Sequence, residues 1–136
     1  MMNRGGDSLE NWVKLRHKCS PVEMFLMLRQ EIFEDIKVRS ELMGKDDSAW
    51  FRMAQTKDNG KMFSVFRERS NDYDVVTFSL QKSGIAVHDR QGNVIQESTL
   101  TLTDNGECKL KLLPSGEELN LWQFRKRFLE RLFFDF

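Results

Sequence analysis

Residues 115–136 read SGEELNLWQFRKRFLERLFFDF, the most heavily apolar segment of this chain, and we expect the rest of the fold to pack against it. Pro114 precedes the segment, and Ser115 with Glu118 matches the S-x-x-E capping box, so the pattern predicts that a helix begins here. At about 100° per residue, the large apolar side chains fall on one broad side. They are Leu121, Trp122, Phe124, Phe128, Leu129, Leu132, Phe133 and Phe136. We therefore predict a C-terminal amphipathic helix that packs across a sheet.

Arg125 projects near the middle of that apolar side. A guanidinium keeps its charge, so it needs a partner or a route to water. Arg29 projects in a similar way into the apolar side of an earlier predicted helix. Two interpretations are open. In the first, each arginine bends to the rim of its helix or pairs with a carboxylate, such as Asp35, Glu31 or one from the sheet. In the second, both face a shared cavity between helices and sheet, where an anionic head group binds. The second interpretation makes Arg29, Arg125 and Trp122 candidate ligand-binding residues.

Length and composition limit the classes of function. At 136 residues the chain is expected to form a single domain, residues 1–136, with a mobile start at residues 1–6. Twenty-one basic residues balance twenty-one acidic ones, which argues against binding to nucleic acid or to an anionic membrane. Eleven Phe and seven Met against one Tyr indicate a large apolar interior, more than one small fold needs. That surplus points to a partner or a ligand.

The two cysteines, Cys19 and Cys108, lie far apart in the sequence and in different kinds of segment. We interpret both as free buried thiols in a reducing compartment. The first residues lack the uninterrupted apolar run of a secretory signal, and no segment is long enough to span a bilayer. The predicted location is therefore the cytoplasm.

One or two helices are predicted before the sheet. A short one begins near Asp7, with Trp12, Val13 and Cys19 on a shared side, and it would depend on docking for its stability. The second is more strongly marked, because Ser20 and the proline after it match an N-cap and a first helical position. It is expected to run to about residue 43. Its main apolar stripe comprises Val22, Phe25, Leu26, Ile32, Phe33, Ile36 and Met43, and a weaker stripe comprises Met24, Met27, Val38 and Leu42.

Between Ser48 and Leu113 the apolar period changes to two, and turn sequences recur at short intervals. Two Asp-Asn-Gly sequences, at 58–60 and 104–106, are typical hairpin turns. The pattern predicts about six antiparallel strands in meander order and a curved sheet, so the fold class is α+β. Whether the sheet closes into a barrel is left open. The early strands also carry apolar side chains on the face that should meet water: Trp50, Met62, Phe66 and Val75.

The candidates for catalysis and metal binding are weak. His88 and Asp89 could form a base with its orienting carboxylate, and Cys108 could supply a nucleophile, but a turn already accounts for Asp89. Only His17 and Cys19 stand close enough in sequence to resemble metal ligands. We therefore expect no enzyme activity, no metal and no cofactor.

The sequence favours a non-catalytic soluble binding module that acts through protein–protein contacts, including self-association. Trp50, Phe66, Phe134 and Phe136 are the candidate interface residues. The alternative is a carrier or sensor of a small amphipathic anion, bound in a pocket between the helices and the sheet. The basic run at residues 125–127 is interpreted as a solvated helix face, because acidic residues on the same helix balance it.

Overall fold

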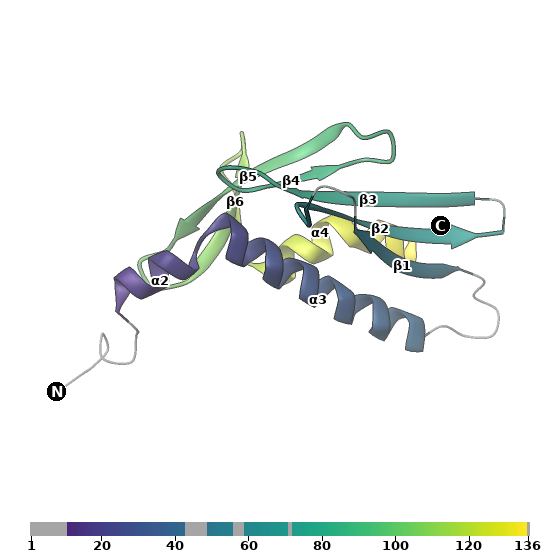
Figure 1. Cartoon of the computed structure of the whole chain (residues 1–136), viewed down its shortest axis with the longest axis horizontal. Helices are drawn as coiled ribbons and strands as arrows, with labels where there is room; N and C mark the ends of the chain where they lie inside the picture. The colour runs from purple at the N-terminus through teal and green to yellow at the C-terminus, as the bar shows by residue number, and fades with distance from the viewer. Residues whose placement is uncertain (1–10, 43–48, 56–58, 71, 136) are drawn as a thin grey trace.

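The computed structural model has the α+β fold that the sequence predicts, with seven strands instead of six (Figure 1). It describes residues 11–42, 49–55, 59–70 and 72–135, so the predicted helix start at Asp7 and helix end near Met43 lie outside the described residues. The helices are α2 (Trp12–Lys18), α3 (Pro21–Glu41) and α4 (Leu121–Phe134). The strands are β1 (Trp50–Gln55), β2 (Met62–Arg69), β3 (Asp72–Leu80), β4 (Ile85–His88), β5 (Val94–Leu102), β6 (Cys108–Leu113) and β7 (Glu118–Leu119).

The strands form one antiparallel sheet in the order of the sequence, from β1 to β7. The sheet stays open, with β1 and β7 at its two edges among the described strands. α3 packs against β1 and β3, while α4 packs against β3, β6, β7 and α3. Figure 1 shows both long helices running along the sheet, with α3 nearer to the viewer and α4 behind it.

A row of phenylalanine rings connects the two helices across the face of the sheet on which both pack. Phe25 of α3 lies 5.2 Å from Phe63 of β2, which lies 5.2 Å from Phe78 of β3, measured between ring centroids. Phe124 of α4 completes the row, 6.2 Å from Phe78. All four rings are at most 1% exposed. Aromatic pairs at such distances add stability beyond the area they bury, and here they fill the space between helices and sheet.

α3 begins where the sequence predicts, because the Ser20 side chain accepts a hydrogen bond from the backbone N–H of Glu23 at 3.2 Å. Its buried side, however, differs from the predicted main stripe. Val22, Leu26 and Phe33 are exposed. The helix is rotated about its axis so that residues spaced three or four apart in the sequence face the sheet. Its buried apolar side chains are Met24, Phe25, Leu28, Ile32 and Ile36.

The start of α4 corrects the prediction from Ser115. The helix begins at Leu121, and the capping box is formed by Asn120 and Gln123, each side chain bonded to the other's backbone N–H. Glu118–Leu119 instead pairs with β6 and becomes β7. The backbone groups just before the helix find partners in the sheet, so the helical turn predicted there does not form.

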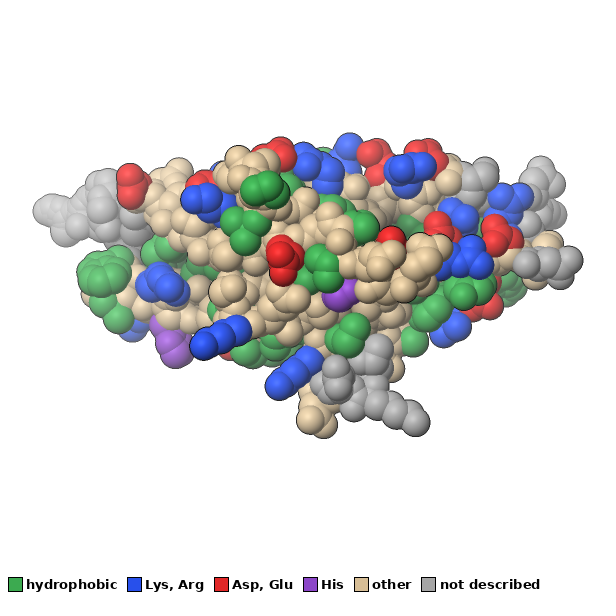
Figure 2. Space-filling view, turned by 90° about the horizontal axis from the view of Figure 1, so that it is seen from above, with side chains coloured by type: hydrophobic (Ala, Val, Ile, Leu, Met, Phe, Trp, Pro, Cys, Tyr) green, Lys and Arg blue, Asp and Glu red, His purple; other side chains and the backbone are tan. Residues whose placement is uncertain are grey.

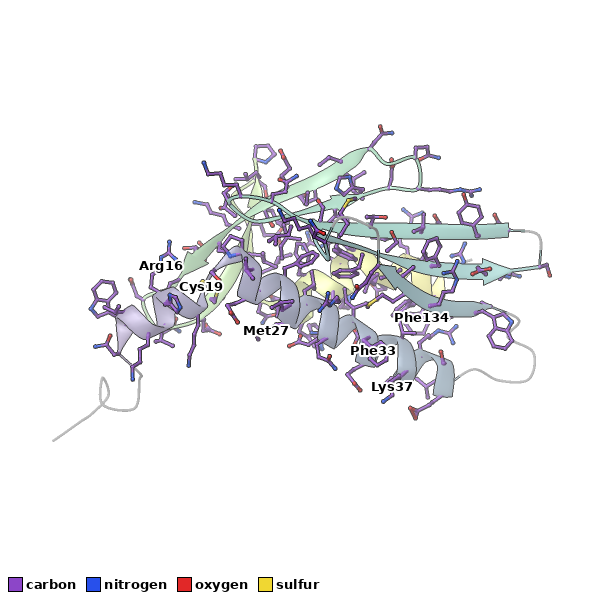
Figure 3. The ribbon with its side chains drawn as sticks, viewed as in Figure 1. Arg16, Cys19, Met27, Phe33, Lys37 and Phe134 are labelled. Carbon is purple, nitrogen blue, oxygen red and sulfur yellow. A yellow bond between two sulfur atoms is a disulfide. The ribbon has the colours of Figure 1, made fainter. Side chains whose placement is uncertain are left out.

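A disulfide joins Cys19 to Cys108, which overturns the prediction of two free thiols. The bond links the junction of α2 and α3 to β6, across 89 residues, with the two Cα atoms 5.4 Å apart. Figure 3 shows Cys19 at this junction. Trp12 and Val13, expected to dock α2, are 69% and 54% exposed. The covalent link therefore holds this end of the chain, and the argument for a reducing compartment loses its basis.

Candidate functional site

A groove runs between the C-terminal half of α3 and the length of α4, with a volume of about 320 Å³. Leu129 and Phe133 of α4 line it and are almost fully buried, at 2% and 6% exposed. Four large apolar side chains beside them remain more than half exposed: Val38 (54%), Leu42 (70%), Trp122 (62%) and Phe134 (62%). Exposed apolar side chains that gather around a concave surface are typical of a binding site.

The helix start explains why Trp122 reaches the solvent. Asn120 caps α4, and Leu121 and Phe124 turn toward the sheet, where both are buried. Trp122 lies about 100° and 200° around the helix from these two residues, on the side that borders the groove. The sequence assigned it to the apolar side for burial, and the structure places it at the surface.

Arg125 crosses from α4 to α3 and binds two carboxylates. Its Nε donates to Asp35 Oδ2 at 2.7 Å, and its Nη1 donates to Glu31 Oε1. The arginine side chain is only 16% exposed. The guanidinium therefore faces two carboxylates of the protein itself. The cluster of Arg125, Glu31 and Asp35 has a formal charge of −1. This is the ion-pair arrangement that the sequence left as one of two interpretations.

Arg29 lies away from Arg125. Its Nη1 lies beside the turn between β1 and β2, 3.9 Å from the point that a Cβ on Gly60 would occupy. Along a helix, Arg29 and Glu31 are separated by roughly 200°, so Arg29 and the Arg125 cluster lie on opposite flanks of α3. The described structure therefore does not bring the two arginines to one cavity.

Two buried arginines hold the C-terminal end of α4, and the sequence analysis missed both. Arg39 Nε donates to the carbonyl oxygen of Phe133 at 3.0 Å, and Arg67 Nη1 donates to that of Leu132 at 3.3 Å. Each arginine is 8% exposed. They bond carbonyls that a helix end leaves without partners, at its negative end. For Arg39, the sequence did contain an indication of burial. Arg39 follows the buried Ile32 by seven residues, which places both on the same face of the helix.

Arg39 also places Phe134 at the edge of the groove. The centre of its guanidinium lies 5.0 Å from the centroid of the Phe134 ring and 4.9 Å from that of Phe51. Cations at such distances are attracted to the face of an aromatic ring. Phe134 therefore has a defined position although it is 62% exposed (Figure 3).

The other predicted interface residues lie elsewhere. Trp50 and Phe66 belong to the face of the sheet opposite the helices, because Phe51, next to Trp50 in β1, faces the core. Trp50 is 70% exposed, whereas Phe66 is covered by Arg52, whose guanidinium lies 4.2 Å from the ring centroid. Phe136 lies outside the described residues. Of the four, only Phe134 lies at the groove.

The structure does not bring His88, Asp89 and Cys108 together in the catalytic arrangement that the sequence offered only as a weak candidate. Asp89 accepts hydrogen bonds from the backbone N–H groups of the turn that follows it, and Cys108 is in the disulfide. The imidazole instead contacts Ser79 Oγ at 2.8 Å through Nε2 and the carbonyl oxygen of Gly92 at 3.3 Å through Nδ1. Ser79 is 7% exposed within β3. The hydrogen bond between Ser79 and His88 connects the neighbouring strands β3 and β4, and both imidazole nitrogens are hydrogen-bonded to protein atoms.

A second hollow, of about 570 Å³, lies between the C-terminal half of α4 and the ends of β2 to β5. Its charges are largely matched. Arg90 lies 3.6 Å from Asp72, and Arg127 binds Glu117 through both terminal nitrogens, at 3.1 and 2.8 Å. Hydrogen bonding from Arg127 lowers the pKa of Glu117 below its ordinary value. Figure 2 shows acidic and basic side chains next to one another along the upper edge of the face seen from above.

Comparison of this chain with protein-family models, with curated proteins and with solved structures finds no match. Among the described residues, no group of three or more His, Cys, Asp or Glu side chains could hold a metal ion. Within the same residues, no helix is both long and apolar enough to cross a membrane. The functional argument therefore rests on the groove and on the side chains around it.

Proposed function

We propose that the protein is a non-catalytic binding module that acts through protein–protein contacts, with the α3–α4 groove as its contact surface and a second copy of the chain as its partner. The observation that carries this proposal is the exposure of Trp122 and Phe134, each 62%, beside the groove that Leu129 lines. Large aromatic side chains at the centre of a patch supply most of the binding energy in protein interfaces.

The charges around the groove favour a second copy. Its polar lining contains both signs, with Arg125 and Lys126 near Asp35 and Glu130. Such a surface can meet its own copy without net repulsion, provided that the orientation brings opposite signs together. Phe134 is also held by Arg39, so little side-chain freedom is lost when a partner covers it.

The alternative function, a carrier of a small amphipathic anion, has less support. The space between helices and sheet is filled by buried phenylalanine rings. Arg125, the cation expected to bind the head group, already donates to Glu31 and Asp35. A negative ligand would have to displace one carboxylate or approach two of them. Native mass spectrometry of the purified protein tests this alternative, which requires a bound small molecule in stoichiometric amount.

Sedimentation velocity over a range of protein concentrations tests the proposed function. We expect the wild-type protein to associate with itself, and Trp122→Ala and Phe134→Ala each to raise the dissociation constant at least about tenfold, because both remove aromatic anchors. Trp50→Ala is the matched control, since Trp50 is at least as exposed, at 70%, but lies on the other face. That variant should stay within about twofold of wild type.

Two results would contradict the proposal. One is a wild-type protein that stays monomeric up to the highest concentration reached. The other is a Trp50→Ala variant that weakens association as much as Trp122→Ala, since the groove would then not be the contact surface.

A further inference from the structure

The exposed side of α4 carries a stripe with a symmetric order of residue types. Its members are four residues apart, and neighbours advance by about 6 Å along the helix axis. The two outer members are aromatic and equally exposed, and the two inner ones are charged, with side chains 53% and 52% exposed. The stripe consists of Trp122, Lys126, Glu130 and Phe134.

We infer that this stripe is the centre of a two-fold symmetric dimer in which α4 packs antiparallel to α4 of the second copy. This inference rests on the proposed function and specifies how the partner binds. A two-fold axis between Lys126 and Glu130 exchanges the ends of the stripe. Trp122 of each copy then meets Phe134 of the other. At the centre, Lys126 of each copy meets Glu130 of the other.

Charge selects the antiparallel arrangement. In the single chain, Lys126 Nζ lies 3.1 Å from Glu130 Oε1, so the two charges stand side by side on the surface. Antiparallel packing joins two such pairs into a group of four alternating charges. Parallel packing would bring Lys126 against Lys126 and Glu130 against Glu130, which repel each other. Complementary charges across an interface set orientation more than affinity, and these pairs favour the antiparallel orientation.

The groove provides space for the aromatic ends of the stripe. Phe134 and Leu42 lie at the groove, and Leu42 is 70% exposed. In the antiparallel arrangement, Trp122 of the second copy rests on the apolar surface that these two residues and Val38 form. Ridges of residues four apart pack with helix axes crossing at about 50°, which keeps the two stripes aligned. The contact thus buries the aromatic side chains that are exposed in the single chain.

Charge reversal tests the arrangement. Lys126→Glu and Glu130→Lys each bring like charges together twice in the dimer, so each should raise the dissociation constant about tenfold or more in sedimentation velocity. The double variant exchanges the two charges and rebuilds every opposite-sign contact. It should return the dissociation constant to within about threefold of wild type. The matched control is Lys37→Glu on α3, which breaks an equally exposed pair with Glu34 and should leave association unchanged.

The outcomes separate this inference from the proposed function. If Trp122→Ala weakens association but both charge reversals leave it unchanged, the groove is the contact surface and the antiparallel arrangement is wrong. A double variant that stays as weak as the single ones also overturns the arrangement. If the wild-type protein does not associate at all, the proposed function itself fails.

Spin labels measure the orientation directly. The labels are placed on exposed positions of α4 beside the stripe, so that Trp122 and Lys126 are retained. In the antiparallel dimer, labels at position 127 are offset by about 3 Å along the helix axis, whereas labels at position 123 are offset by roughly 15 Å. In a parallel dimer each label lies level with its own copy, so neither position is offset. Equal distances at the two positions would therefore refute the inference, even if the charge variants behave as expected.

Discussion

The two ends of α3 are held in different ways. At its N-terminal end, Cys19 is covalently bonded to β6, and Phe25 lies within the row of packed rings. Toward its C-terminal end, ion pairs from Arg125 to Glu31 and Asp35 join α3 to α4. Apolar side chains are exposed near both ends, Val22 and Leu26 at the first and Leu42 at the second. We call the first end, which the disulfide and the rings hold, the closed end, and the second, which borders the α3–α4 groove, the open end.

This difference suggests different roles for the two ends of α3. A disulfide and interlocked rings leave little room for a partner. Ion pairs at the margin of a groove hold two helices together while their apolar neighbours remain accessible. We expect the closed end to contribute more to the stability of the fold, and we propose the open end as the surface for binding. The predictions that follow test whether the two ends differ in this way.

The largest expected effect concerns the closed end. Replacing both Cys19 and Cys108 by Ser should lower the free energy of unfolding by about 4 kcal/mol, because the bond closes a loop of 89 residues in the unfolded chain. Urea unfolding followed by circular dichroism measures the loss, provided that the variant still folds.

A reductant supplies the control for this prediction. Added to the wild-type protein, it should reproduce the loss of stability, and added to the double variant it should change nothing. A wild-type protein whose urea midpoint does not respond to complete reduction would show that the covalent link is not what stabilises the closed end.

A smaller effect is expected at the open end. Arg125→Met leaves Glu31 and Asp35 close together without their cation and should lower the free energy of unfolding by about 1–2 kcal/mol. The figure lies between those for exposed and fully buried pairs, because the arginine side chain is 16% exposed and the carboxylates 38% and 31%. Urea unfolding at a fixed protein concentration measures it.

The matched control is Lys37→Met, which removes one partner of an exposed pair on the same helix and should cost less than about 0.5 kcal/mol. Neutralising Glu31 and Asp35 as Gln and Asn in the Arg125→Met background should recover part of the loss. If Arg125→Met is as stable as wild type, the ion pairs do not hold the open end.

Local patterns in the sequence predict much of this fold. The Ser20 cap, the Asp-Asn-Gly turn at residues 104–106 and the alternation of the strands depend on neighbouring residues, and the structure confirms them. In the other Asp-Asn-Gly sequence, Asn59 and Gly60 lie in a turn, and Asp58 lies outside the described residues. β7 was missed because its two residues form a strand only through pairing with β6. The S-x-x-E pattern at Ser115 and Glu118 is also local and predicted a helix start there. The pairing of Glu118 and Leu119 with β6 prevents that helix turn from forming.

Features that depend on distant segments could not be predicted in the same way. The disulfide depends on where the end of α2 meets β6, and a separation of 89 residues gives no indication of that. Arg39 and Arg67 are explained only by the position of the C-terminal end of α4. At the groove, the sequence singled out Trp122, Arg125 and Phe134 within one helix. It also placed Val38 and Leu42 in the weaker apolar stripe of the earlier helix, but their position at the groove follows only from the packing of α3 against α4.

The smallest expected effect on stability concerns the exposed ion pair between Arg127 and Glu117, for comparison with the partly buried pairs of Arg125. Arg127 binds Glu117 at the surface and lowers the pKa of that carboxyl below its unfolded value, through hydrogen bonding first and charge second. A lowered folded pKa means that the pair stabilises the fold above the unfolded value, about 4.3, and that this contribution disappears as the pH falls through the folded pKa. Glu117→Gln should therefore be slightly less stable than wild type at neutral pH, and the two urea midpoints should converge in acid. A difference that persists unchanged at the lowest pH at which both proteins fold would show that Glu117 acts through packing instead of charge.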